Sequence, residues 1–272
     1  MISAVKPMIS NQYISQVRLR REDVPSFTPY PFSLPAVRHL NVLDLHPLVT
    51  FLIGENGCGK STLLEAIAVS WGFNPEGGSK NFRFGTRSSH SDLHKFIRLA
   101  KGIKRPRDGF FLRAESFFNV ATEIEKLDSE PSFGPPIIDS YGGQSLHEQS
   151  HGESFLALMM NRFGGEGLYL LDEPEAALSP QRQLSVIARI HDLVNENSQF
   201  VIATHSSILM AYPDCYIYSL TTKGITRVDY YQTEHYRVMH DFMVNPKRML
   251  DILLDDTSSN KAVPRTSKRR CL

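Results

Sequence analysis

The chain has 272 residues, a formal net charge of +1 at pH 7 and 41% hydrophobic residues, so it can bury a substantial core and its charge favours no particular partner. Its three cysteines, Cys58, Cys215 and Cys271, are widely spaced, which argues against a disulfide framework. No apolar run reaches the roughly 20 residues needed to cross a bilayer. Residues 1–10 also lack the apolar region of a signal peptide, so we expect a soluble cytoplasmic protein.

The first part of the chain predicts strands and one strong helix. Residues 12–20 alternate well enough for a strand, and the Pro-rich residues 23–35 form a connection. Residues 48–54, LVTFLIG, are a short apolar run that ends in glycine, which indicates a buried strand. Residues 60–73 have helical spacing, and a short helix is expected around residues 90–103.

The rest of the chain alternates strands with helices. Residues 109–118 predict a strand that runs into a helix, and the Gly- and Pro-rich residues 128–143 predict a loop. Further elements are expected as helices at 153–163 and 179–197, buried strands at 167–174 and 199–206, and a hairpin over 215–231. This alternation predicts an α/β fold with a mainly parallel central sheet.

A phosphate-binding loop is predicted at GENGCGKS, residues 54–61, between an apolar strand and a helix. Its glycines let the backbone curl so that N–H groups point at phosphate oxygens, and the following helix start favours an anion. We expect Lys60 to reach the β- and γ-phosphates, Ser61 to bind Mg²⁺ and Thr62 to bond the α-phosphate. The predicted ATP-binding residues are Gly54, Glu55, Asn56, Gly57, Cys58, Gly59, Lys60, Ser61 and Thr62. A Gly-rich turn with a chance lysine is the alternative.

Two further buried strands end in residues suited to catalysis. LYLLDEP ends in Asp172, which would hold Mg²⁺, and Glu173, which would polarise the attacking water as general base. VIATHS ends at His205, whose imidazole could sense the γ-phosphate or orient the water. The alternative is a pair of solvated acids before a turn, with a structural histidine.

The segment HEQSH, residues 147–151, matches the HExxH pattern of zinc peptidases. That function needs both histidines one turn apart on a continuous helix, plus a third ligand. Gly142, Gly143 and Gly152 lie close by, and each interior glycine weakens a helix by about 1 kcal/mol. We therefore expect no zinc site here.

Four motifs in order resemble those of ABC-type ATPases: GENGCGKST the phosphate loop (Walker A), QSHGE the signature, LLDEPEAALSP the second acidic motif (Walker B), and ATHS the switch histidine. ATHSSILMAYPDCYIYSL and HYRVMHDFMVNPKRMLDILL resemble more closely the compact stand-alone bacterial ATPases of the AAA family that are related to RecF and Rad50 and to the SMC-like group. The resemblance covers roughly residues 13–254.

The resemblance implies a P-loop NTPase fold of the ABC type, with an antiparallel β part at the N-terminal side and a small helical lobe. It also implies a hydrolase that binds Mg-ATP and forms a head-to-tail homodimer. In that dimer the signature residues contact the nucleotide of the opposing subunit; here they are Ser150, His151, Gly152 and Glu153. Glu153 stands where many transporters have glutamine, and Ser179 where aspartate is frequent.

Members of this family often carry a glutamine near Mg²⁺ at a strand end before the signature, and Glu115 would take that place as a further metal ligand. Phe27, Tyr30 and Phe32 are candidates for stacking on adenine, or simply for packing. Without heptads between the phosphate loop and the signature, a long coiled-coil arm is excluded.

The expected domains are an N-terminal extension (1–12), an ATPase domain (13–254) with a helical and basic insert at about 76–160, and a disordered basic tail (255–272). The basic segment between Lys80 and Arg107 contains only one acidic residue, Asp92. It could bind DNA or an acidic partner, or form a solvated face. Its residues are Lys80, Arg83, Arg87, Lys95, Arg98, Lys101, Lys104, Arg105 and Arg107. A stand-alone ATPase of this kind could drive or gate a partner in DNA repair, genome maintenance or phage defence. The alternatives to it are the nucleotide-binding subunit of a membrane transporter and a nucleotide-gated binding module with little turnover.

Overall fold

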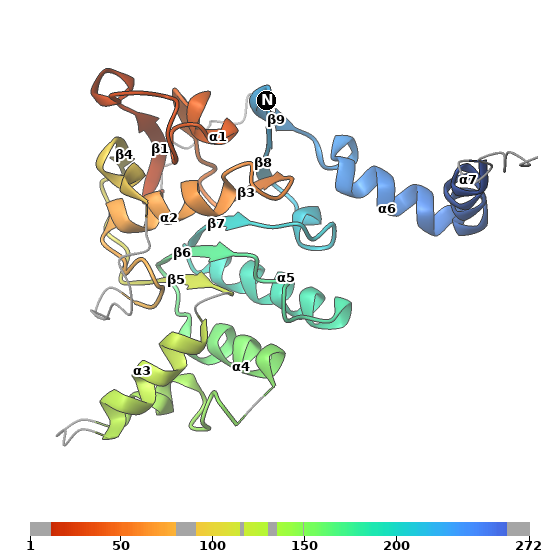
Figure 1. The fold of residues 1–272 in the computed structure, drawn as a ribbon. Helices are drawn as coiled ribbons and strands as arrows, with labels where there is room; N and C mark the ends of the chain where they lie inside the picture. The colour runs from red at the N-terminus through yellow and green to blue at the C-terminus, as the bar shows by residue number, and fades with distance from the viewer. Residues whose placement is uncertain (1–11, 80–90, 115–116, 130–134, 149, 260–272) are drawn as a thin grey trace, which may run out of the picture. The chain divides into compact units, whose positions relative to one another are not determined.

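The computed structural model describes residues 12–79, 91–114, 117–129, 135–148 and 150–259. The chain divides into two units, one ending at Tyr230 and one beginning at Tyr231. The first unit carries all the strands found in the described ranges, arranged in two sheets (Figure 1).

A six-stranded sheet forms the centre of the first unit, in the order β5-β6-β7-β3-β8-β9. Neighbouring strands from β5 to β8 pair in parallel, and β9 pairs antiparallel with β8. The strands are β3 (Val49–Gly54), β5 (Asp108–Arg113), β6 (Gly167–Asp172), β7 (Gln199–Ala203), β8 (Cys215–Thr221) and β9 (Gly224–Val228). The prediction of an α/β fold with a mainly parallel sheet and a terminal hairpin is confirmed.

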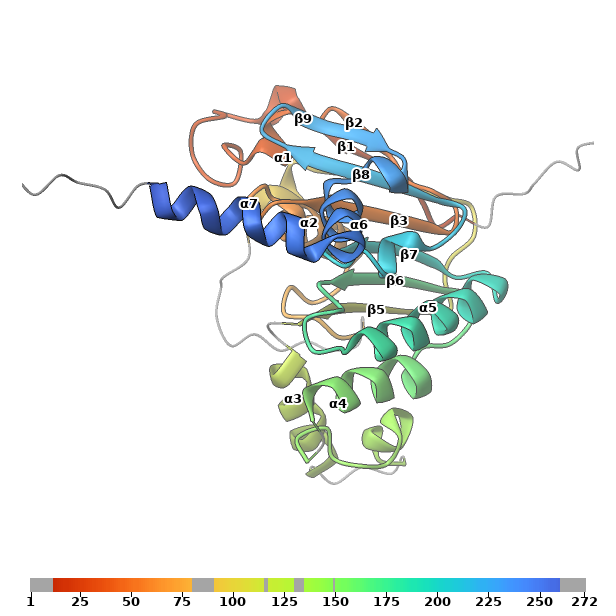
Figure 2. The ribbon, with the colours of Figure 1, turned by 90° about the vertical axis from the view of Figure 1, so that its right-hand side faces the viewer.

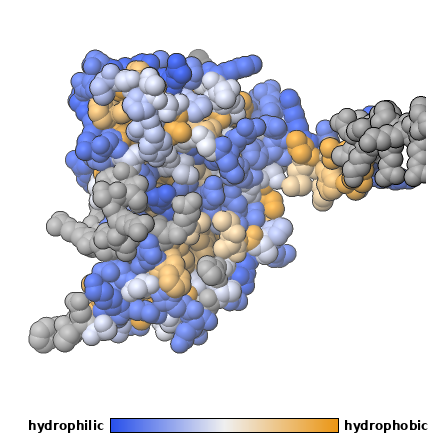
Figure 3. All heavy atoms as spheres, in the orientation of Figure 1, coloured by the Kyte–Doolittle hydropathy of each residue, from blue (hydrophilic) through white to orange (hydrophobic). Residues whose placement is uncertain are grey.

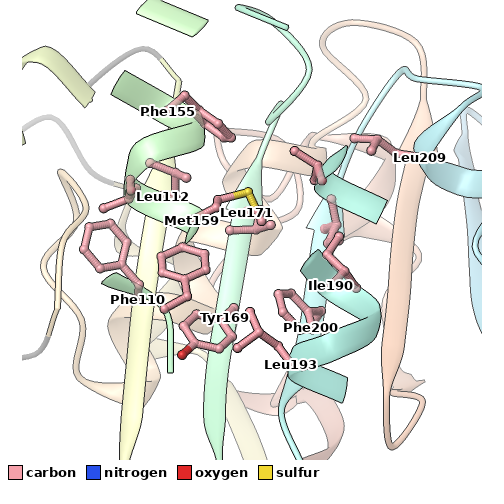
Figure 4. Packing of buried hydrophobic residues seen from close by; sticks show 14 of the residues in the cluster. Phe110, Leu112, Phe155, Met159, Tyr169, Leu171, Ile190, Leu193, Phe200 and Leu209 are labelled. Atoms are coloured by element: carbon pink, nitrogen blue, oxygen red, sulfur yellow. The ribbon is translucent and has the colours of Figure 1, made fainter. Parts of the chain in front are cut away.

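Both faces of this sheet are covered, which is why its central strands are continuous apolar runs. Side chains alternate along β6, so that Tyr169 and Leu171 enter one core while Leu168 and Leu170 enter the other. Helix α5 (Pro180–Asn195) contributes to the first core and α2 (Lys60–Trp71) to the second. Figure 2 shows the two helices on opposite faces of the sheet, and Figure 4 shows the aromatic packing of the first core.

A second sheet, in the order β2-β1-β4, is antiparallel and packs against α2. Its strands are β1 (Ile14–Leu19), β2 (Val42–Asp44) and β4 (Ile97–Lys101), with the short helix α1 (Pro35–Arg38) between β1 and β2. The helix predicted around residues 90–103 was wrong. A short 3₁₀ turn (Asp92–Lys95) is followed directly by β4, because pairing with β1 satisfies the backbone and buries Ile97.

A small helical lobe follows β5, as the family resemblance implied. It contains α3 (Phe117–Ser129), a 3₁₀ turn (Ile137–Tyr141) and α4 (His151–Ala157), which continues as a π turn (Leu158–Arg162). The insert predicted at about 76–160 also includes β4 and β5, which pair with β1 and β6 outside it. The predicted insert therefore contains strands of both sheets as well as the lobe.

The second unit consists of α6 (Glu234–Val244) and α7 (Pro246–Ser259). The Thr233 hydroxyl accepts the Tyr236 N–H and so caps α6. Apolar side chains of both helices are exposed, including Met243 and Leu254, and Figure 3 shows this apolar surface. Since α7 runs to Ser259, the tail predicted to begin at residue 255 was wrong at its start, and residues 260–272 lie outside the described ranges.

In the ranges that the structure describes, none of the helices is long and apolar enough to span a membrane.

Candidate nucleotide site

The predicted phosphate loop lies between β3 and α2, at the carboxyl end of the central strands (Figure 1). Gly54, Gly57 and Gly59 all have positive φ angles, of 145°, 79° and 103°, which glycine adopts without steric cost. The Lys60 Nζ donates hydrogen bonds to the carbonyl oxygens of Gly54 at 2.8 Å and Glu55 at 3.0 Å. Its ammonium group is thus held over the loop, at the start of a helix that favours a bound anion.

The loop meets the first acidic residue directly. The Ser61 Oγ donates a hydrogen bond to Asp172 Oδ1 at 2.9 Å, although the two residues are 111 positions apart. Asp172 ends β6 and is buried. A hydroxyl and a carboxylate side by side are the hard oxygen donors that Mg²⁺ prefers, so the residues present fit the predicted metal.

A second buried pair beside Asp172 was not found from the sequence. Arg113, at the end of β5, donates from Nη1 to Glu65 Oε2 at 2.7 Å, and its Nε lies 3.8 Å from Asp172 Oδ2. Glu65 lies on α2, where its Oε1 also accepts the Ser91 N–H at 3.0 Å. The one sequence signal was a single carboxylate within the apolar run LLEAIAV. Arg113 therefore supplies a nearby positive charge to two buried carboxylates.

Glu173 and His205 face each other across the ends of β6 and β7. Glu173 has a φ of 51°, unusual for a residue with a side chain, and its N–H donates to Ala203 O at 2.9 Å. The Glu173 Oε1 lies 3.7 Å from His205 Nε2. Burial lowers the pKa of His205 and Lys60 lowers it further, while Glu173 raises it. A neutral imidazole beside a carboxylate can take part in proton transfer.

The signature residues lie elsewhere, at the start of α4 in the helical lobe (Figures 1 and 2). The Ser150 Oγ donates to Glu153 Oε2 at 2.6 Å, and the Ser150 N–H donates to the same oxygen at 3.1 Å. Glu153 Oε1 in turn lies 3.1 Å from Arg182 Nη2 on α5. These bonds from Ser150 and Arg182 lower the pKa of Glu153. The signature is therefore tied to α5.

Gly152 fills a position where a side chain would collide with the loop that follows Glu173. A Cβ there would lie 2.4 Å from Ala177 O and 2.8 Å from Arg182 Nη1. His151 is the first residue of α4. Among the described residues, no hydrogen bond or ion pair joins residues 150–153 to the phosphate loop of the same chain.

The zinc peptidase alternative is excluded by the backbone. Helix α4 begins at His151, so His147 lies before it, and the two histidines do not share a helix. The His147 Nε2 instead lies 3.1 Å from Thr122 Oγ1, and its ring packs against Phe118. Across the described ranges, no group of three His, Cys, Asp or Glu side chains could hold a metal ion.

The remaining predicted residues are the metal-ligand candidate Glu115 and the three adenine candidates. Glu115 lies outside the described residues, so its assignment as a metal ligand stays a prediction. Of the adenine candidates, Phe32 is buried and packs edge-on against Phe96, whereas Tyr30 is exposed. Phe27 lies under the Arg21 guanidinium.

Parts of the chain are similar to known proteins. Residues 27–125 match the family described as AAA domain. The cobalt import ATP-binding protein CbiO of Salmonella typhimurium is 26% identical over 190 residues, which cover 63% of this chain and 66% of the relative. The matched part is therefore less than two thirds of that relative's length.

Two solved structures are similar to this chain at low scores. They are cbiO1 from Clostridium perfringens, part of the ABC transporter complex cbiONQ (TM-score 0.45, 15% identity, 90% of this chain and 99% of that chain), and the SMC head domain from Thermotoga maritima (TM-score 0.40, 16% identity, 80% and 100%). At these TM-scores neither structure bears on function. The ordered motifs, and the strand ends that bring them together, resemble those of ABC-type P-loop ATPases, and part of the chain is similar to the AAA domain family and to CbiO.

Proposed function

We propose that the chain binds Mg-ATP, forms a head-to-tail homodimer and hydrolyses ATP to drive or gate a partner. The observation that carries this proposal is the hydrogen bond between Ser61 Oγ and Asp172 Oδ1 at 2.9 Å. It brings the end of the phosphate loop to the end of β6, where Glu173 follows. The groups needed for phosphoryl transfer to water therefore converge on one edge of the sheet.

Each residue has a distinct task in this reaction. Lys60 and the N–H groups of the loop bind the phosphates, and Ser61 and Asp172 would hold Mg²⁺. When bound, Mg²⁺ supplies positive charge that offsets the charge developing on the phosphate oxygens. Glu173 accepts a proton from water as the water oxygen bonds to the γ-phosphorus; the bond from that phosphorus to the β–γ bridging oxygen breaks, and ADP leaves with the electron pair. His205 orients the water or the γ-phosphate.

The position of the signature supports the proposed homodimer. Residues 150–153 lie in the helical lobe, and the resemblance assigns them to the nucleotide of a second copy. In that copy the Ser150 hydroxyl and the Gly152 N–H would approach the γ-phosphate. The Ser150 hydroxyl now donates to Glu153 at 2.6 Å, so this bond must exchange for one to the nucleotide. Part of the free energy of ATP binding would then favour the state in which two copies close around the nucleotide.

Purified protein is expected to release phosphate from ATP only when Mg²⁺ is present. Lys60→Met should weaken ATP binding by about 10- to 100-fold, because one charge-assisted contact to phosphate contributes about 1.5–3 kcal/mol. Phosphate release and binding of a fluorescent ATP analogue measure the two quantities. Tight ATP binding without any release would favour the nucleotide-gated binding module instead.

The basic segment supports a nucleic-acid partner as part of this proposal. Arg98 on β4 lies directly opposite Arg18 on β1, and both are exposed. Like charges opposite each other destabilise a sheet, so an anionic partner would relieve this cost. Lys95 and Arg107 instead pair with Asp92 and Glu166, at 2.8 Å each. Lys80, Arg83 and Arg87 lie outside the described residues.

Replacing Arg98, Lys104 and Arg105 together with glutamate is expected to abolish salt-sensitive DNA binding. Losing three phosphate contacts lowers the slope of log K against log salt by about 3. Fluorescence anisotropy with a short duplex at several salt concentrations measures both affinity and slope. Unchanged affinity would leave these residues as a solvated face.

A transporter subunit is the second candidate function. It is favoured by the 26% identity to CbiO, which is named a cobalt import ATP-binding protein. Such a subunit would co-purify with a membrane permease. Recovery of the tagged protein in the membrane fraction, retained in high salt, would support this candidate over the stand-alone ATPase.

A further inference from the structure

Glu175 is an acidic residue near the site for which the proposed reaction has no task. It lies in the turn that leads from β6 to α5, beyond Glu173. Its Oε2 atom is buried and has no hydrogen-bond partner among the described residues. Burial raises the pKa of Glu175, the hydrogen bond from the His205 N–H lowers it, and the nearby Glu173 carboxylate raises it further. Burying a carboxyl group costs free energy unless hydrogen bonds compensate for the lost contact with water.

What Glu175 holds is the backbone of His205. The His205 N–H donates to Glu175 Oε1 at 2.5 Å. The Thr204 hydroxyl next to it accepts the Ser206 N–H at 2.9 Å, so the turn after β7 is held at neighbouring residues. On the other side of the turn, the Ser206 hydroxyl donates to Gln183 Oε1 at 2.6 Å.

These bonds set where the imidazole lies. The same turn places His205 Nε2 at 3.7 Å from Glu173 Oε1, and the backbone on the Glu173 side is held by its bond to Ala203 at 2.9 Å. Glu175 is thus the side chain that ties the strand end carrying Glu173 to the residue carrying the imidazole. Displacing a catalytic group by about 1 Å can cost about 10²-fold in rate.

We propose that Glu175 is a positioning residue that fixes the His205 side chain against Glu173 by holding the His205 backbone N–H. The proposal rests on the proposed hydrolysis of ATP. Glu175 itself transfers no proton and touches no phosphate in this scheme. It acts through His205 alone.

Two substitutions separate positioning from proton transfer. Glu175→Gln keeps an oxygen that accepts the His205 N–H, so turnover should stay within about 3-fold of wild type. Glu175→Ala removes the acceptor, and turnover should fall about 30- to 100-fold with ATP affinity unchanged. Equal loss in both variants, or no loss in the alanine variant, would overturn the proposal.

A second readout follows the histidine itself. The chain has ten histidines, so the NMR signal of the His205 ring is assigned with a His205→Gln variant. The wild-type ring should titrate below 6.5, the ordinary value. In Glu175→Ala the pKa should rise toward that value as the ring leaves its buried place, and in Glu175→Gln it should stay low. An unmoved His205 titration in the alanine variant would also overturn the proposal.

A matched control comes from the helical lobe. Asp128 accepts the N–H groups of Ile137 and Ile138 at 2.6 and 2.9 Å. Asp128→Ala therefore also removes a carboxylate that accepts backbone N–H groups, but in the helical lobe and not beside His205. It should lower thermal stability but leave turnover and the His205 titration unchanged. If Glu175→Ala does not fold, Glu175→Asp, whose shorter side chain cannot reach, replaces it with the same expectations.

A double substitution tests whether Glu175 acts only through His205. In a His205→Gln background, adding Glu175→Ala should change turnover by less than about 2-fold, since the group it positions is gone. A further large loss would contradict the proposal. If wild-type protein hydrolyses no ATP while the His205 titration still shifts in Glu175→Ala, the proposed function fails and the positioning stands.

Discussion

Glu173→Gln is expected to lower ATP turnover by about 10²- to 10³-fold, because the amide cannot accept the proton of the attacking water. The substitution keeps the size of the side chain, and the backbone bond from Glu173 to Ala203 at 2.9 Å does not involve it. ATP binding, which depends on the phosphate loop, should therefore be retained. Single-turnover phosphate release and equilibrium ATP binding measure the two effects separately.

The same variant should accumulate as a dimer when ATP is added. Once hydrolysis is slow, the state in which the nucleotide joins two copies persists, so the mass measured by light scattering should double with ATP and not with ADP. Lys60→Met serves as the control that cannot bind the phosphates well. A variant that stays monomeric with saturating ATP would contradict the head-to-tail homodimer, and turnover equal to wild type would remove Glu173 from its assigned role.

Gly152→Ala is expected to be strongly harmful, although alanine usually stabilises a helix by about 1 kcal/mol relative to glycine. The added Cβ would lie 2.4 Å from Ala177 O, a backbone atom that cannot rotate away. Helix α4 or the loop after Glu173 must move, which costs about 1–3 kcal/mol of stability. A shift of this loop should also lower turnover by about 10- to 100-fold.

Thermal unfolding and ATP turnover measure these two consequences, with Gly164→Ala as the matched control. A Cβ at Gly164 would meet only Asp108 Oδ2, at an ordinary 3.6 Å, so that variant should resemble wild type. The double variant Gly152→Ala, Glu173→Gln should fail to form the ATP-dependent dimer. Wild-type stability and dimerisation in Gly152→Ala would mean that the signature need not pack against Ala177.

Local patterns predicted the parts of the site that lie within one short segment. The phosphate loop needs its glycines, Lys60 and Ser61 in sequence between a strand and a helix, and the structure has them there. The ends of β6 and β7 were also predicted, because their apolar runs are covered on both faces and stop at polar residues.

Predictions that depend on pairing between distant segments were less successful. Residues 97–101 have a spacing that permits a helix, but β1 lies beside them and they form β4. A separate error was local, because the tail was expected from residue 255, yet α7 continues to Ser259. In the first case the hydrogen bonds that decided the structure came from a segment far away in the chain.

The sequence by itself predicted the resemblance to ABC-type ATPases, the α/β class and the order of phosphate loop, signature, acidic pair and histidine. Only the tertiary structure decided that Ser61 meets Asp172, that Arg113 bridges Glu65 and Asp172, and that Glu175 holds the His205 backbone. The physical reason is that motifs are set by local backbone chemistry, whereas the burial and pairing of charged side chains depend on which strand ends the sheet topology brings together.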